Sequence, residues 1–266
     1  MDFSVLDAKK PTMKNLSFKK PLKNILSITL VGRNYFQFKQ FRIEQDQCAN
    51  KVSTDACVFG AWLKQELCGK TILDVGCGTG LISLMLAQER SNQLTCIEIH
   101  MDCAQQARNN ISNSPWNERI KVIQADIRQW QADKKYDCIV CNPPFFNNTS
   151  LSRNEERNLA RQTATLSPSD WVHILNQEQL QNSDIYLLLS TNDVLVEYQK
   201  VLASIGFSHQ QTISLFDHAK ASCKRVILVA KRVTSPSSNH LIIYKKADGS
   251  YTEQFVDLLR EFYLHY

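Results

Sequence analysis

Hydrophobic and polar residues follow one another along the chain in the order typical of an α/β protein. Short apolar runs with the length of buried strands are separated by segments with apolar residues at helical spacing. The expected strands are 71–75, 94–99, 120–124, 138–141, 185–189, 207–216, 225–232 and 241–244. The expected helices are 56–67, 81–88, 102–112, 169–180, 193–204 and 251–263. This alternation predicts a mostly parallel sheet covered by helices, with an antiparallel finish at 207–216 and 225–232.

The N-terminal part of the chain lacks this pattern and carries the positive charge. Residues 1–42 hold nine Lys and Arg against two acidic residues, a net charge of +7, whereas the remainder holds 22 basic and 24 acidic residues, a net of −2. We therefore expect a basic N-terminal arm over 1–34 and one domain over 35–266, which begins with a short aromatic strand. A basic arm can follow a phosphate backbone. A solvated disordered tail, or an over-extended translation start, has the same composition.

Neither a membrane span nor a metal site is expected. The apolar run 25–31 is too short to cross a bilayer. Nine cysteines are scattered through apolar segments, which fits reduced thiols in a cytoplasmic protein. The single CxxC, Cys138 and Cys141, falls in an expected strand. Its side chains would point to opposite faces, so the pair is not expected to bind zinc.

The stretch Asn142-Pro143-Pro144-Phe145 ends the 138–141 strand abruptly, because proline has no N–H to give to a sheet. It leaves a carboxamide at the carboxyl end of a strand, the edge at which open α/β sheets bind their ligands. The Asn142 amide can accept hydrogens from a planar amine, such as the exocyclic amine of a nucleobase, while Phe145 stacks on its ring. A strand-ending turn with core aromatics is the simpler alternative.

A second polar group follows the 71–75 strand. Asp74 precedes the turn Gly76-Cys77-Gly78-Thr79-Gly80, which leads into a helix. Glycines permit positive φ and let a ligand approach the backbone closely, although a tight strand-to-helix turn would need them too. A carboxylate here would repel a pyrophosphate but would suit an ammonium group. The turn therefore favours S-adenosyl-L-methionine over a nicotinamide cofactor.

Two more acidic residues end the next two expected strands. Glu98 lies 24 residues after Asp74, about where an acidic residue accepts ribose hydroxyls. Asp126 can accept the amino group of the cofactor's adenine, and Ile127 can pack on the ring. Each alone is unremarkable at the end of a strand. With Asp74 and Asn142 they form an ordered set of polar groups on four successive strands, which is a strong signal.

The segment before the first helix offers further candidates. Lys51 and Thr54 can line a ligand site at the helix entrance. Ser53, Thr54 or Asp55 can also cap the helix, since their oxygens accept the free N–H groups of its first turn. Capping is the expected role for at least one of Thr54 and Asp55.

Four basic residues are candidate RNA contacts. Arg153, Arg157 and Arg161 recur every four residues after the Asn-Pro-Pro-Phe stretch and would form one basic face if helical. Two glutamates between them are equally consistent with an ordinary solvated helix. Lys39 is the fourth candidate.

Taken together, the motifs resemble the class I S-adenosylmethionine-dependent methyltransferases that carry Asn-Pro-Pro-Phe or Asn-Pro-Pro-Tyr, the amino-group methylases. The closer resemblance, over about residues 36–266, is to the bacterial valine-tRNA adenine-N6 methyltransferases. It is carried by 38–41, 51–55, 60–62, 74–80, 84–88, 110–111, 114–116, 118–120, 125–127, 142–145, 160–161 and 262–264. Ser53 and Ala56 stand where that family often has glycine, and the arm has no counterpart.

The resemblance implies a Rossmann-like, seven-stranded, mostly parallel sheet with an antiparallel C-terminal hairpin. It implies S-adenosyl-L-methionine as cofactor and the anticodon loop of tRNA, at adenine 37 of tRNA(Val), as the substrate. A monomer is expected, but the sequence does not determine the oligomeric state. It assigns catalysis to Asn142, Pro143, Pro144 and Phe145. Other amino-group methylases that act on rRNA guanine, DNA adenine or protein glutamine remain alternatives, as does a non-catalytic RNA-binding protein. A nicotinamide-dependent oxidoreductase is disfavoured by Asp74.

Overall fold

The computed structural model describes residues 34–89, 91–143, 166–190, 192–233 and 236–265. The chain divides into two units, Met1–Arg33 and Asn34–Tyr266, and the described residues all belong to the second. The predicted basic arm lies outside them apart from its last residue. Pro144, Phe145, Arg153, Arg157 and Arg161 also lie outside the described residues.

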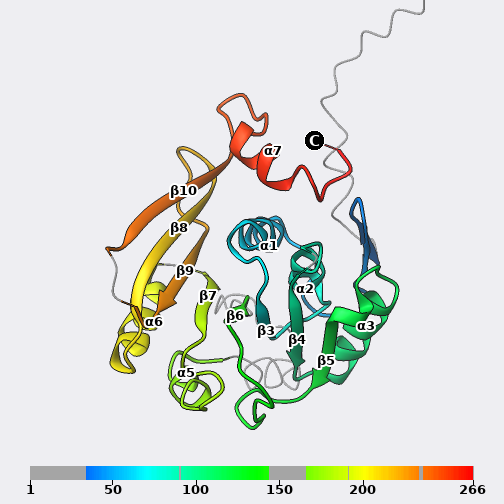
Figure 1. Cartoon of the computed structure of the whole chain (residues 1–266). Helices are drawn as coiled ribbons and strands as arrows, with labels where there is room; N and C mark the ends of the chain where they lie inside the picture. Colours follow the sequence, from blue (N-terminus) through cyan, green and yellow to red (C-terminus); the bar gives the residue numbers. More distant parts are fainter. Residues whose placement is uncertain (1–33, 90, 144–165, 191, 234–235, 266) are drawn as a thin grey trace, which may run out of the picture. The chain divides into compact units, whose positions relative to one another are not determined.

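An eight-stranded sheet in the order β10-β8-β9-β7-β6-β3-β4-β5 forms the centre of the described domain (Figure 1). Its strands are β3 (Thr71–Val75), β4 (Gln93–Glu98), β5 (Ile120–Gln124), β6 (Cys138–Cys141), β7 (Asp184–Leu189), β8 (Ser208–His218), β9 (Arg225–Lys231) and β10 (Ser238–Lys245). Strands β3 to β7 are parallel, and β9 is antiparallel to both β7 and β8. The Rossmann-like sheet with an antiparallel finish is confirmed.

The eighth strand extends the seven that the family resemblance implies. The apolar pattern predicted a strand at 241–244, and β10 runs from Ser238 to Lys245 and pairs in parallel with β8. β8 is 11 residues long, and without β10 its outer N–H and C=O groups would be unpaired. The edge strand therefore satisfies the backbone of β8.

Helices cover both faces of the sheet (Figure 1). Side chains of α1 (Thr54–Glu66), α2 (Leu81–Leu86), α3 (Met101–Ser112) and α7 (Glu253–Leu259) pack into the core of one face. Side chains of α5 (Asp170–Ile174) and α6 (Asn192–Ser204) pack into the other. A short 3₁₀ helix, Asn117–Arg119, precedes β5. Cys138 belongs to the first core and Cys141 to the second, so the CxxC thiols do point to opposite faces.

Two predicted helices are markedly shorter than the pattern indicates, and the one expected at 81–88 ends at Leu86. The helix expected at 169–180 ends at Ile174, because turns follow it. There Gln177 accepts a hydrogen bond from Ala132 N and donates one to the Trp130 carbonyl. The helix expected at 251–263 is only Glu253–Leu259, capped by Thr252. In both segments most apolar residues are buried, Val172 being an exposed exception, but the backbone is not helical throughout.

The predicted aromatic strand is a small hairpin, β1 (Tyr35–Gln37) and β2 (Arg42–Glu44). Phe38 and Phe41 stack with ring centres 4.5 Å apart and are buried in the first core. Lys39 N donates to the Phe262 carbonyl at 2.9 Å. The hairpin thus joins the two ends of the described domain.

Within the described ranges, every helix is too short or too polar to traverse a bilayer. The same ranges contain no cluster of three or more His, Cys, Asp or Glu side chains able to hold a metal ion. All nine cysteines are free thiols, and most are buried.

Candidate active site

The carboxyl ends of four parallel strands meet at one edge of the sheet. From β3 the chain proceeds outward through β4 and β5 on one side and through β6 and β7 on the other. This reversal of strand order is where open α/β sheets place ligands. The structure therefore brings the ends of β3, β4, β5 and β6 to one edge. The predicted residues at these ends are Asp74, Gly76, Gly78, Gly80, Glu98, Asp126, Ile127, Asn142 and Pro143.

The glycine turn after β3 has the left-handed backbone that its glycines permit. Gly76, Gly78 and Gly80 have φ values of 72°, 56° and 81°, a left-handed conformation that favours glycine. A Cβ added at Gly76 or Gly78 would meet nothing within 4 Å. Gly76 N donates to the Ile97 carbonyl of β4 at 2.8 Å, and the buried Asn110 of α3 donates to the Thr79 carbonyl at 2.9 Å. Hydrogen bonds with β4 and α3 therefore fix the turn, while the Cβ positions of Gly76 and Gly78 face open space.

Glu98 connects this turn to the loop after β4. It is 5% exposed, and its Oε2 accepts a hydrogen bond from Gly78 N at 2.9 Å. Its Oε1 accepts one from His100 N, also at 2.9 Å. Each carboxylate oxygen has a second lone pair available. Glu98 therefore holds two loops together and keeps acceptor capacity for a ligand hydroxyl.

Asp74 lies inside the protein beneath the turn. It is 1% exposed and accepts a hydrogen bond from Ser83 Oγ of α2 at 2.7 Å. The pKa of Asp74 is raised to about 7: burial is the main cause, the negative charge of Glu98 adds to it, and the hydrogen bond from Ser83 opposes it. Asp74 is thus a carboxyl group whose charge is sensitive to a nearby cation. The Ser83 contact lies nine residues away on the next helix, and the sequence analysis missed it.

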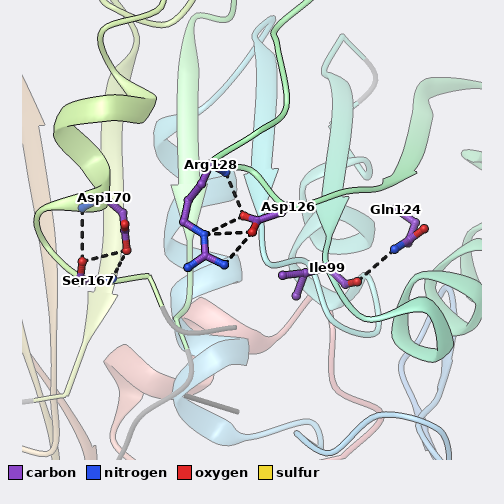
Figure 2. A network of polar contacts seen from close by, with 6 residues as sticks. All are labelled: Ile99, Gln124, Asp126, Arg128, Ser167 and Asp170. Carbon is purple, nitrogen blue, oxygen red and sulfur yellow. Dashed lines mark hydrogen bonds and ion pairs between the residues drawn. The ribbon is translucent and has the colours of Figure 1, made fainter. Parts of the chain in front are cut away.

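Asp126 is held by an arginine two residues further along the chain (Figure 2). Arg128 Nε donates to both carboxylate oxygens, at 2.9 and 3.0 Å, and Nη2 donates to Oδ2 at 2.6 Å. These hydrogen bonds hold the pKa of Asp126 below its usual range. The short spacing Asp126-Ile127-Arg128 is a local signal that the sequence analysis did not use.

A small cavity lies beside this pair, between the ends of β3, β4 and β5. Its volume is about 30 Å³, and its lining is mainly apolar, with Asp126, Ile127 and Arg128 on one side. Leu166 lines it too, just before the Ser167–Asp170 turn that starts α5 (Figure 2). Such a volume holds about two waters.

Asn142 differs from the acidic residues of the site because its acceptor has no partner. Its Oδ1 is buried, and no described residue donates a hydrogen bond to it. Pro143, which follows it, is buried as well. A buried carbonyl oxygen without a donor costs roughly 1–3 kcal/mol. It is therefore suited to an N–H group from a ligand.

The entrance of α1 departs from one expectation. Ser53 is the N-cap and accepts a hydrogen bond from Ala56 N at 3.2 Å, so the prediction that Thr54 or Asp55 caps the helix is wrong. The Asp55 carboxylate instead contacts β10, where its Oδ1 accepts a hydrogen bond from the Tyr244 hydroxyl at 2.9 Å. Lys51 is exposed and donates to the Gln45 carbonyl, while Thr54 is half-buried at the helix start.

Lys39 lies apart from the predicted site residues at the ligand edge. It donates to the Arg260 carbonyl, and its neighbour Gln40 contacts Gln88 just after α2. Both α1 and α2 start at the ligand edge and run away from it, since each is followed by the amino end of a strand. Lys39 therefore lies towards the opposite edge of the sheet.

Comparison with known proteins agrees with this arrangement. A family model for the methyltransferase small domain matches residues 48–205. The chain is 36% identical over 240 residues to a tRNA1(Val) (adenine(37)-N6)-methyltransferase from Cytophaga hutchinsonii, covering 88% of this chain and 100% of that protein. It is 38% identical over 237 residues to one from Haemophilus influenzae, covering 87% and 99%.

This chain therefore belongs to the methyltransferase small-domain family. The fold agrees as well: a crystal structure of a predicted O-methyltransferase, Atu636 from Agrobacterium tumefaciens, superposes with a TM-score of 0.56 at 17% identity, covering 78% of this chain and 96% of that one. Membership of the family makes a methyl donor the expected cofactor. The open Gly76 and Gly78 and the buried, unpartnered oxygen of Asn142 fit a donor and an amine acceptor at this edge.

Proposed function

We propose that this methyltransferase transfers a methyl group from S-adenosyl-L-methionine to the exocyclic N6 amine of adenine 37 in the anticodon loop of tRNA1(Val). The named relatives, similar over nearly their whole length, support the substrate. The observation that carries the chemistry is the buried Oδ1 of Asn142, an acceptor at the ligand edge to which no residue of the described ranges donates.

Residues of β3, β4 and β5 would hold the cofactor. Gly76, Gly78 and Gly80 would let it lie against the backbone, and Glu98 would accept its ribose hydroxyls. Asp126 and Ile127 would take its adenine, and Asp74 would favour its ammonium group. Lys51 and Thr54 would border its methionine end. When bound, the cofactor supplies a methyl group on a positively charged sulfur.

Residues that follow β6 would hold the acceptor. The lone pair of an exocyclic amine is delocalised into the ring, which makes the nitrogen a weak nucleophile. Asn142 Oδ1 and the Pro143 carbonyl would accept its two hydrogens, localise the lone pair and aim it. Held in this way, the nitrogen would take the methyl group as the bond between that carbon and sulfur breaks, and the amine would then lose one proton. Holding both groups in attack geometry supplies much of the rate.

The RNA must present the adenine outside its stack. Phe145, after Pro144, would stack on the base, which is worth roughly 1–3 kcal/mol. Unstacking costs less in a single-stranded loop than in a duplex. Arg153, Arg157 and Arg161 would contact phosphates nearby.

The test is methylation with labelled cofactor of tRNA, rRNA, DNA or protein from cells that lack the gene, followed by mass spectrometry of nucleosides. We expect N6-methyladenosine in the anticodon loop of tRNA1(Val) alone. Label in rRNA guanine, DNA adenine or protein glutamine instead would assign the chain to another class of amino-group methylase. No transfer to any of the four would contradict the proposal altogether.

A further inference from the structure

The loop between β8 and β9 concentrates positive charge in a domain that is otherwise slightly acidic. Residues 218–225 read His-Ala-Lys-Ala-Ser-Cys-Lys-Arg and contain no acidic residue, whereas the chain beyond residue 42 has a net charge of −2. Lys220 and Lys224 are exposed, and Arg225 is half-buried. No described residue forms a hydrogen bond or an ion pair with the Lys220 side chain. We call Lys220, Lys224 and Arg225 the β8–β9 basic loop.

This loop emerges at the same edge of the sheet as Asn142. Cys141 of β6 pairs with Leu187 of β7, and Leu189 of β7 pairs with Val226 of β9. Arg225 is therefore just past the level of Asn142, on the second strand away from β6. Two interstrand spacings are about 10 Å. The loop thus borders the place where the acceptor amine would lie.

A buried carboxylate fixes the base of the loop. Asp55, at the start of α1, is 4% exposed. It lies 3.5 Å from Lys224 Nζ and 3.7 Å from Arg225 Nε, and it accepts the hydrogen bond from Tyr244. One carboxylate faces two cations, so the group keeps a net positive charge. Lys220, further out, adds to it.

We propose that the β8–β9 basic loop binds backbone phosphates of the RNA strand that flanks the target adenine. The inference rests on the proposed function, because it takes RNA as the substrate and Asn142 as the place of the base. Lysine and arginine contacts to phosphates position a nucleic acid without reading its sequence. The remaining residues of the loop are small or polar and include no Trp, Phe or Leu, the side chains that anchor proteins in bilayers. RNA is therefore favoured over an anionic membrane.

The test compares two double variants of the full chain that lose the same charge. Lys220→Gln/Lys224→Gln neutralises the loop, and Lys134→Gln/Lys135→Gln neutralises two exposed lysines just before β6, at the opposite edge of the sheet. Arg225 is left in place so that buried Asp55, which loses Lys224 as a partner, keeps one cation beside it. Affinity for an anticodon stem-loop is measured by fluorescence anisotropy at several salt concentrations, with calorimetric affinity for S-adenosyl-L-methionine as the folding control.

We expect the loop variant to bind RNA roughly tenfold more weakly. In a plot of log affinity against log salt concentration, its slope should be shallower by about 0.7 for each phosphate contact removed. Its cofactor affinity should equal that of the wild type, and the opposite-edge variant should bind RNA normally. Equal RNA affinity and slope in both variants would overturn the inference. Loss of binding to phosphatidylserine vesicles without loss of RNA binding would overturn it in favour of a membrane.

The binding assay does not require turnover. If the wild-type chain binds the stem-loop through these lysines but methylates no tRNA, the proposed function fails and the RNA surface remains. If the wild-type chain methylates tRNA and the loop variant binds RNA as well as its control, the proposed RNA-binding role of the β8–β9 basic loop is wrong and the proposed function stands.

Discussion

The two halves of the ligand edge are built differently. On the side of β3, β4 and β5, polar groups are engaged by the chain itself: Glu98 with two backbone N–H groups, Asp74 with Ser83, and Asp126 with Arg128. On the side of β6, the Oδ1 of Asn142 is buried and has no donor among the described residues. The first half is organised before any ligand binds, and the second keeps an unsatisfied acceptor.

This difference matches the tasks that the proposed reaction would give the two halves. A cofactor must be held in one orientation over the glycine turn, which favours groups already fixed by hydrogen bonds. The substrate amine must give up its hydrogen bonds to water and form new ones with the protein. A hydrogen-bond acceptor that no other group occupies favours this exchange. If the comparison is right, changes on the β6 side should affect turnover and changes on the other side should affect cofactor affinity.

The largest effect is expected from Asn142→Ala. The variant loses the only side-chain acceptor assigned to the amine, so we expect kcat to fall by about 100- to 1,000-fold or more, as when one preorganised hydrogen bond is lost at a reacting centre. Cofactor affinity should stay close to that of the wild type. The measurements are single-turnover methyl transfer and calorimetry. A collapse of cofactor affinity with turnover largely retained would contradict the role of Asn142 in holding the amine and would assign it to cofactor binding.

A smaller effect, on binding, is expected from Glu98→Ala. It leaves Gly78 N and His100 N without their acceptor and removes the proposed ribose contact, so S-adenosyl-L-methionine should bind about 10- to 100-fold more weakly. Gln124→Ala is the matched control, since it removes only a hydrogen bond to the Ile99 carbonyl of the same loop (Figure 2). Equal affinities of the two variants would show that Glu98 supports the loops without touching the ligand.

The side of the site built from local sequence was the easier one to predict. The glycine turn, Glu98 and the end of β6 follow from strand ends and turn chemistry within a few residues, and the structure brings them to one edge. The alternation also predicts that this part of the sheet is parallel, but it does not predict the strand order, which the structure supplies.

Contacts between distant segments could not be predicted in this way. Asp55 and Tyr244 are 189 residues apart, and nothing near either residue signals their hydrogen bond, although Ser53 was among the caps that the sequence offered for α1. The short α5 is another example, because Gln177 is held by the segment before β6. The placement of Lys39 likewise depends on how its hairpin packs against the C-terminal residues.

A third prediction uses the pKa of Asp74, which burial raises to about 7. Below that pH the carboxyl group is protonated in the free protein, and an ammonium ligand would favour its ionised form. Cofactor affinity should therefore fall as the pH drops below about 7, by up to tenfold per unit. Asp74→Asn should show no such pH dependence in calorimetric titrations between pH 5.5 and 8.

Thermal unfolding supplies the control for this titration. The folded pKa of Asp74 lies above its usual 3.8, so the stability it contributes is complete below about pH 4 and is lost as the pH rises through about 7. Asp74→Asn should remove that decline. If stability declines as expected but cofactor affinity does not change with pH, Asp74 titrates without meeting the ammonium group.

The smallest effect is expected from Arg128→Gln, which tests how far the first half is organised in advance. Arg128 orients the Asp126 carboxylate and keeps it ionised. The pair is partly exposed, so it contributes below about 1 kcal/mol, and cofactor affinity should fall two- to fivefold. Arg108→Gln, a charge-matched change on α3, should have no effect. Tighter binding by Arg128→Gln would mean that the arginine competes with the cofactor's adenine for Asp126 and for the cavity of about 30 Å³ beside it. The β5 end of the site would then be closed until ligand binds, and the contrast between the two halves would be confined to the glycine turn and Glu98.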